Sequence, residues 1–374
     1  MQIHQARWTP ASRWTSPPTS DPNAQLVLAF SDRLLLEGDA PLDDIRAAYP
    51  HARLVGCSTG GDICGERVAD ELSLTALSFE HVHTQPVWVT VRDGASYEAG
   101  LAAATKLKAD GLVHVFVLAS GLKVNGSELV RGLTAGLPHG VTITGGLAGD
   151  GSRFERTFTI CDDAVAEDGI VAVGFYGSRL RVGYASLSGW DPFGPERLVT
   201  RSVGTELFEL DGTPALELYR RYLGPEAQGL PASGMFFPLS LRGEDGGCGV
   251  IRALLSIDER KGSLTFAGDV PEGGYVRLMR GNFERLIDGA AEAARLTTPQ
   301  PASSAELAIL VSCIGRRAVL GQRVEEEVEG VRDVLGHTTA ITGFYSYGEI
   351  GPFASGRKCE LHNQTMTVTT LSEN

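Results

Sequence analysis

The chain has 374 residues, enough for two domains of ordinary size and for a hydrophobic core that needs no disulfide or metal staple. Its 33 Lys and Arg face 46 Asp and Glu, and the formal net charge of −13 repels phosphate backbones and anionic lipid heads. This charge disfavours nucleic acid and membrane surfaces as partners, while 43% hydrophobic residues and 46 glycines predict a globular protein rich in turns.

The N-terminal residues 1–21 predict a tail, because they mix polar residues with Trp and Pro and contain no apolar run of a secretory signal. No segment of the chain approaches the roughly 20 apolar residues that a membrane helix needs. The six cysteines form no CxxC pair, which argues against a zinc cage and favours buried thiols in a reducing compartment. We therefore expect a cytoplasmic protein.

A repeated unit is the most informative feature of the sequence. Three short runs of β-branched residues and leucine end in Ser, as buried strands would: Leu26–Ser31, Val115–Ser120 and Leu307–Ser312. A helix-compatible segment follows each of them, at Pro41–Tyr49, Gly126–Ala135 and Val324–Leu335. Three strand–helix–strand units are therefore predicted.

The second strand of each unit runs into a glycine-containing loop, and the three loops are Gly56–Ile63, Gly145–Asp150 and Gly343–Ile350. Their first glycines follow the strand-ending Ser by 25, 25 and 31 residues. Strand-like segments come after each loop and suggest added hairpins. We expect an α/β fold with mixed parallel and antiparallel sheets covered by helices, built from repeated strand–helix–strand–hairpin units in two domains.

The boundary between the two domains is expected at a turn with the sequence Asp-Gly-Thr-Pro, residues 211–214. Thr213 suits a helix N-cap and Pro214 the first helical position, ahead of a helix over Ala215–Leu223. The predicted domains are residues 22–212 and 213–374.

Glycines at the carboxyl end of a strand let backbone N–H groups approach a ligand closely, and equally they permit tight turns. The carboxylates Asp62, Asp150 and Glu349 follow glycines in the three loops, where each must be solvated, paired or bound to a ligand. None of the loops has the spacing of a phosphate-cradling or dinucleotide motif, and GxSxG is absent around the strand-ending serines. Catalysis is thus unsupported.

His362 stands out among the histidines, because it lies in a polar strand 13 residues after Glu349 and a hairpin would return it to the third loop. Tyr345 and Tyr347 are close by in the sequence. Such a set of donors, acceptors and flat faces is typical of small-molecule pockets, and cross-strand hydrogen bonding at a sheet edge explains it equally well.

Five segments together resemble the FIST family: GCSTGGDI (56–63), TGGLAGDG (144–151), SCIGRRAVLG (312–321), GFYSYGEIGP (343–352) and ELHNQTMT (360–367). The resemblance runs from about residue 24 to the C-terminus and implies an N-terminal and a C-terminal FIST domain. It also implies a cytoplasmic sensory protein for small ligands, with amino acids as one proposal. Such proteins often work with a histidine kinase or a cyclic-di-GMP enzyme, here in trans.

A subgroup of such proteins binds haem b and senses nitric oxide, and His362 would be the axial ligand if haem binds here. Three hypotheses follow: a small-ligand sensor, a haem-based nitric oxide sensor, and a hydrolase or transferase that uses Asp62, Glu349 and His362 as acid and base. The sensor is the leading hypothesis, with no catalytic residues. The expected ligand-binding residues are Cys57, Ser58, Thr59, Asp62, Gly146, Asp150, Tyr345, Tyr347, Glu349, His362 and Asn363.

Overall fold

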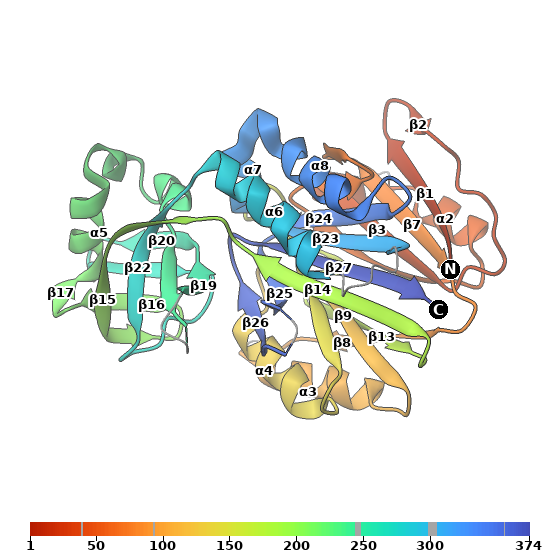
Figure 1. Cartoon of the computed structure of the whole chain (residues 1–374), viewed down its shortest axis with the longest axis horizontal. Coiled ribbons are helices and arrows are strands. Elements are labelled where there is room, and N and C mark those ends of the chain that lie inside the picture. The colour runs from red at the N-terminus through yellow and green to blue at the C-terminus, as the bar shows by residue number, and fades with distance from the viewer. Residues whose placement is uncertain (39, 93, 244–247, 298–304, 355) are drawn as a thin grey trace.

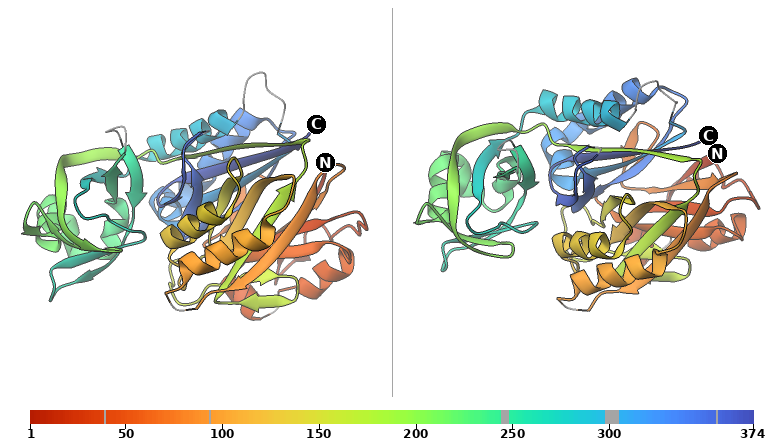
Figure 2. Two further views of the ribbon diagram at one scale, coloured as in Figure 1. Left: turned by 90° about the horizontal axis from the view of Figure 1, so that it is seen from below. Right: turned by 60° about the horizontal axis from the view of Figure 1, so that its bottom comes forward.

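The computed structural model describes residues 1–374 except 39, 93, 244–247, 298–304 and 355. It has a large lobe of three sheets and a small lobe formed by residues 191–280, which lies to one side (Figures 1 and 2). The small lobe is inserted between the first strand of the third repeat and the remainder of that repeat.

The three repeats have similar orders of elements, although the second element is a short strand in the first repeat and a helix in the other two. The first contains β1 (Gln2–Thr9), β2 (Arg13–Trp14), β3 (Leu26–Asp32), α1 (Arg33–Glu37), α2 (Leu42–Ala48), β4 (Arg53–Thr59), β5 (Asp62–Cys64), β6 (Arg67–Ala69) and β7 (Leu72–Ser78). The second contains β8 (His83–Thr90), α3 (Ser96–Leu107), β9 (Leu112–Ala119), α4 (Gly126–Gly136), β10 (Thr142–Leu147), β11 (Thr159–Cys161), β12 (Ala164–Ala166) and β13 (Gly169–Tyr176).

The third repeat is split by the insertion. It contains β14 (Leu180–Leu187), α6 (Phe283–Thr297), β23 (Leu307–Cys313), α7 (Ile314–Leu320), η3 (Gly321–Arg323), α8 (Val324–Leu335), β24 (Ala340–Ser346), β25 (Gly348–Pro352), β26 (Cys359–His362) and β27 (Met366–Glu373). The small lobe contains β15 (Asp191–Val203), β16 (Glu206–Leu210), β17 (Thr213–Pro214), α5 (Ala215–Leu223), η1 (Gly224–Gly229), η2 (Ala232–Phe236), β18 (Leu239–Arg242), β19 (Cys248–Arg252), β20 (Leu254–Asp258), β21 (Ser263–Phe266) and β22 (Tyr275–Arg280).

Each repeat builds one sheet but sends a hairpin into a neighbour's sheet. The central pair of strands is parallel in every sheet: β3 with β4, β9 with β10, and β23 with β24. The strand after each glycine loop then pairs elsewhere: β5 with β24 of the third repeat, β11 with β4 of the first, and β25 with β10 of the second. This exchange is cyclic, so each sheet is completed by another repeat. The mixed α/β fold built from repeated units is confirmed.

The first glycine of each loop is required by the close approach of the parallel neighbour. A Cβ atom on Gly56 would lie 1.9 Å from the carbonyl oxygen of Ala29. The equivalent distance is 1.9 Å at Gly343, where the oxygen belongs to Leu310, and Gly145 faces Val117 in the same way. The repeated glycine that the sequence displays is therefore a packing requirement of the strand pair.

The core of the large lobe is formed where the three sheets face one another. Its buried members come from every repeat and include Phe30, Phe116, Val171, Val311 and Phe344. The rings of Phe30 and Phe344 stack with centroids 4.8 Å apart. The small lobe has its own core.

The predicted N-terminal tail contains a strand, and the predicted domain boundary lies within the small lobe. Within the predicted tail, residues 2–9 form β1, which pairs with β7 and buries Ala6 and Trp8. The turn at residues 211–214 lies inside the small lobe, between β16 and α5, and the predicted helix Ala215–Leu223 is α5. Within the described residues, no helix combines the length and apolar character that crossing a membrane requires.

The glycine requirement predicts the effect of two alanine substitutions. Gly56→Ala and Gly343→Ala should each lower the free energy of unfolding by about 3 kcal/mol or more, because the methyl group overlaps a backbone carbonyl that cannot move without breaking the strand pair. Urea unfolding followed by circular dichroism measures this. Gly330→Ala, in α8 where a Cβ has ordinary contacts, is the control and should stabilise by up to about 1 kcal/mol. Equal stability of all three variants would contradict the argument.

Candidate functional site

The three glycine loops meet at one junction in the large lobe. Each loop donates a backbone N–H group to a carbonyl of another loop: Gly149 to Ser58 (3.0 Å), Gly60 to Tyr345 (2.7 Å) and Tyr347 to Leu147 (3.1 Å). These hydrogen bonds run around the junction in a ring that joins every pair of repeats, and a further one from the Tyr345 N–H group to the Gly61 carbonyl (2.8 Å) also joins the third repeat to the first. The loops contact one another directly, and a cavity lies beside them.

The carboxylates of the first and second loops are buried and held by backbone groups. Asp62 accepts a hydrogen bond from the Glu71 N–H group (2.9 Å), and burial raises its pKa to about 7. Burial also raises the pKa of Asp150, but hydrogen bonds from the Tyr347 hydroxyl and from the N–H groups of residues 154–156 outweigh it, so that the pKa is lowered overall. Asp150 therefore organises the segment that follows it.

The carboxyl group of Glu349 is fully buried in a small polar cluster. It accepts hydrogen bonds from the Ser346 hydroxyl (2.7 Å) and from the N–H and hydroxyl groups of Thr365 (3.0 and 2.9 Å). Burial is the main cause that raises its pKa to about 8. Glu349 is thus held mostly as the neutral acid at neutral pH.

The hairpin does return His362 to the third loop, where it is the cross-strand partner of Glu349. Its ring is fully buried, packs edge-on against Phe353, and donates from Nε2 to the carbonyl oxygen of Gly351 (2.7 Å). Burial lowers its pKa to about 4, and Nδ1 has no hydrogen-bond partner. The imidazole is therefore a neutral group inside the sheet packing.

The other expected residues have structural contacts. Cys57 and Gly146 are buried in central strands, and Tyr345 donates its hydroxyl to Glu327 (2.6 Å). Ser58 accepts from the N–H group of Phe158 (2.8 Å), and Thr59 accepts from the N–H group of Gly61 (3.1 Å). Asn363 is buried, with no hydrogen-bond partner for either side-chain polar atom.

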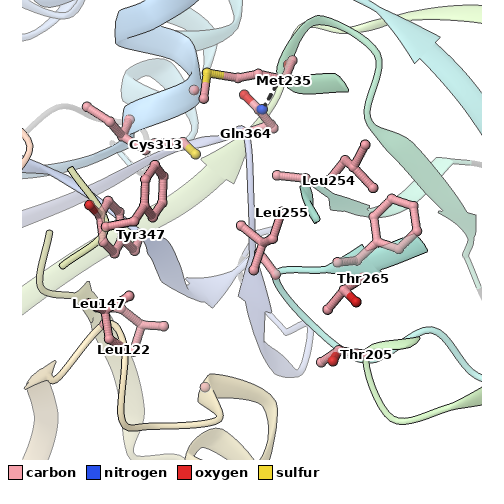
Figure 3. A pocket seen from close by; sticks show the side chains of 18 of the residues that line it. Leu122, Leu147, Thr205, Met235, Leu254, Leu255, Thr265, Cys313, Tyr347 and Gln364 are labelled. Carbon is pink, nitrogen blue, oxygen red and sulfur yellow. Dashed lines mark hydrogen bonds between the residues drawn. The ribbon is translucent and has the colours of Figure 1, made fainter. Parts of the chain in front are cut away.

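A cavity of about 760 Å³ lies beside the junction, between the large and the small lobe (Figure 3). Of the eleven expected ligand-binding residues, Tyr347 lines it. The second repeat contributes residues 121–126 with Leu147, Ser152 and Phe154; the third contributes residues 313–315 with Tyr347 and Gln364; the small lobe contributes Thr205, residues 231, 232, 235, 253–255 and 265–267. The acid and base set of Asp62, Glu349 and His362 does not line it.

Three large apolar side chains face this cavity while remaining accessible: Leu122, Phe154 and Leu255, with 39%, 41% and 48% of their surface exposed. Phe154 has a left-handed backbone, with φ 54°, which is unfavourable for a bulky residue. Its ring stacks on that of Tyr347 with centroids 4.5 Å apart. The hydrogen bond from its N–H group to Asp150 holds it there.

Gln364 supplies a polar group at the inner end of the cavity. It also has a left-handed backbone, with φ 62°, and its side chain is fully buried. The amide Nε2 donates to the carbonyl oxygen of Met235 in the small lobe (3.1 Å), whereas Oε1 has no partner. Several buried polar atoms lack a partner, including those of the neighbouring Asn363, but among the described residues Gln364 is the one of this set that lines the cavity.

Sequence reasoning did not select Gln364, although it lies within the ELHNQTMT segment, one residue after the last selected one. Its place directly after His362 and Asn363, which were both selected, is the feature of the sequence that could have indicated it. Leu122, Phe154 and Leu255 carry no such signal, because they belong to loops and an edge strand whose meeting depends on the fold.

The haem expected for one subgroup does not fit the residues around His362. Binding iron through Nε2 would break the hydrogen bond to Gly351, and His362 does not line the cavity described above. Among the described residues, no group of three or more His, Cys, Asp or Glu side chains is placed to hold a metal ion.

The chain is similar to proteins of a known family. Models of the FIST N domain and the FIST C domain match residues 25–213 and 215–352. An uncharacterized protein of Methanocaldococcus jannaschii is 25% identical over 336 residues, which are 82% of this chain and 62% of that protein. The chain thus spans less than two thirds of that relative's length.

Solved structures give weaker matches. A cyanuric acid hydrolase from A. caulinodans aligns over 100% of this chain and 99% of its own, with a TM-score of 0.41 and 9% identity. A second cyanuric acid hydrolase structure gives a TM-score of 0.33 and 10% identity with the same coverage.

The raised pKa of Glu349 predicts a pH dependence of stability. The unfolded chain releases this proton near pH 4.5 and the folded chain near pH 8, so the free energy of unfolding should fall between these values by at most about 1.4 kcal/mol per pH unit. Glu349→Gln keeps the neutral hydrogen-bonding shape and should remove this part of the fall. Urea unfolding at several pH values measures it. Glu329→Gln, on the exposed face of α8, is the control, and a wild-type curve parallel to that of Glu349→Gln would contradict the assignment.

Proposed function

Because the chain belongs to the FIST family, whose domains are generally sensory domains of signal transduction, we propose that it senses a small molecule bound in the cavity between its two lobes. The observation that carries this proposal is the buried, unpartnered Oε1 atom of Gln364, a residue that lines a cavity with mainly apolar walls. The volume of about 760 Å³ lies within the range of small-molecule sites.

Both lobes wall the cavity, which supports a signal based on their arrangement. Hydrogen bonds join the lobes around it: Asn125 to Asp269 (3.3 Å), Gln364 to the Met235 carbonyl (3.1 Å) and Arg252 to the Leu361 carbonyl (2.9 Å). A ligand that touches both walls binds one arrangement of the lobes better than another. Binding then shifts the population of the two arrangements.

The connection between the lobes is linked to the cavity through Trp190. This residue lies between β14 and β15, and its indole N–H group donates to the backbone carbonyl of Gln364 (2.9 Å). The neighbouring Gly189 has φ 95°, a conformation that favours glycine. A ligand that moves Gln364 therefore acts directly on the segment leading into the small lobe.

The proposal extends to the receiver of the signal. The family resemblance implies a histidine kinase or a cyclic-di-GMP enzyme as partner, and a change in lobe arrangement alters the surface available to it.

The cavity is tested with 8-anilinonaphthalene-1-sulfonate, a fluorescent probe that has apolar aromatic rings and one sulfonate. We expect one molecule to bind per chain, and Leu255→Trp to weaken binding by about tenfold or more because the larger ring occupies the cavity. Leu34→Trp, on a half-exposed leucine of α1 away from the cavity, is the matched control and should bind as the wild type does. Fluorescence titration measures both, and equal binding by Leu255→Trp would overturn the location.

The coupling to Trp190 is tested by fluorine NMR of protein labelled with 5-fluorotryptophan. The chain has four tryptophans, and Trp190→Phe identifies the signal of interest. Saturation with the same probe should shift the Trp190 resonance, whereas that of Trp8, buried in the first sheet, should stay in place. An unchanged Trp190 signal at saturation would contradict the coupling.

A further inference from the structure

We infer that the cavity selects a flat, apolar ligand that carries one N–H or O–H donor and at most one negative charge, and that it excludes zwitterionic amino acids. This inference rests on the proposed function and names the ligand class for the same site. It departs from the amino-acid ligand that the family resemblance suggests.

The side chains that line the cavity disfavour a positively charged ligand. Among the described residues that line the cavity, Lys123 is the one charged side chain, and no Asp, Glu, Arg or His takes part. The ammonium group of an amino acid would therefore enter a mainly apolar space without a carboxylate in its lining. Burying an unpaired charge is strongly unfavourable, so a free amino acid or a cationic amine is disfavoured.

Two carboxylates that contact lining residues are held by hydrogen bonds. Asp150, behind Tyr347, accepts hydrogen bonds from three backbone N–H groups and from the Tyr347 hydroxyl. Asp269 accepts one from Asn125, at the edge where the lobes meet. Neither residue lines the cavity, so the lining itself offers no carboxylate to an ammonium group.

The shape of the cavity favours a flat ligand. Figure 3 shows Tyr347, Leu147 and Leu122 on one side and Leu254 and Leu255 on the other. The Tyr347 ring is held by its stacking on the Phe154 ring, so the first wall includes a fixed aromatic pair. Aromatic and leucine side chains on facing walls bury both faces of a planar molecule.

The amide group of Gln364 favours a ligand that carries a hydrogen-bond donor. Gln364 Nε2 is committed to the Met235 carbonyl, which fixes the orientation of the amide and leaves Oε1 as an acceptor. An N–H or O–H group of the ligand would satisfy this oxygen. A single negative charge is tolerated if it lies toward Lys123, an exposed residue of the lining.

A matched series of indoles tests the inference, because its members share one ring and differ in charge or donor. Isothermal titration of the full chain should show binding of indole and indole-3-acetate. Tryptamine and L-tryptophan should bind about tenfold more weakly or not at all, since their ammonium group lacks a partner. The compound 1-methylindole, without the N–H donor, should bind about fivefold more weakly than indole.

Two substitutions make the test specific for the site. Lys123→Gln should weaken indole-3-acetate and leave indole unchanged, and Lys108→Gln, at the exposed end of α3, is its control. Leu255→Asp adds a carboxylate to the wall at a half-exposed position and should reverse the order, so that tryptamine binds more tightly than indole-3-acetate.

The outcomes separate the two proposals. If neither the naphthalene probe nor any indole binds the wild type, the proposed function fails and this inference fails with it. If the probe binds in the cavity but L-tryptophan or tryptamine is the tightest indole, or no indole binds, the ligand class alone is overturned.

Discussion

The ring of backbone hydrogen bonds among the three glycine loops is the constraint on which the rest of the structure depends. Each loop joins a strand in its own sheet to a strand in a neighbouring sheet, so the loops must approach one another closely. Side chains at the first loop position would overlap the adjacent carbonyl oxygens, as the 1.9 Å distances at Gly56 and Gly343 indicate. Glycine there makes the exchange of hairpins possible, and the exchange makes the three repeats one cooperative body.

Much of this architecture could be predicted from the sequence, because repeats leave a periodic signal. The three repeated strands end within one residue of the predicted serines, and the glycine loops and the helix Ala215–Leu223 agree with the structure. The sequence does not indicate which sheet each hairpin joins. The strand β5 is three residues long, and nothing in Asp62–Cys64 specifies that it pairs with β24 rather than within its own repeat. Pairing across hundreds of residues is decided by packing of the whole core.

The candidate site was predictable in part, for a physical reason that the carboxylates illustrate. Polar residues after glycines suggest a ligand site. The carboxylate oxygens of Asp62, Asp150 and Glu349 instead accept hydrogen bonds from backbone and hydroxyl groups in and beside the tight loops. In a crowded junction, buried polar atoms form hydrogen bonds with one another and are not available to a ligand. The free acceptor at the cavity belongs to Gln364, whose left-handed backbone turns its side chain toward the small lobe. Sequence pattern does not distinguish a satisfied oxygen from an unsatisfied one.

The cavity lies where the approximate threefold repetition is broken. Beside the first loop, Arg317 donates to the Gly60 carbonyl and pairs with Asp70, and its guanidinium fills the space that a Cβ on Gly61 would enter. Beside the second loop, the buried Arg33 side chain lies near Asp150. At the third loop the corresponding segment carries Leu122, which fills less space and leaves the Tyr347 ring bordering the cavity. The insertion between β14 and α6 places the small lobe over this third position, so that an apolar site forms where a second lobe is available to close it.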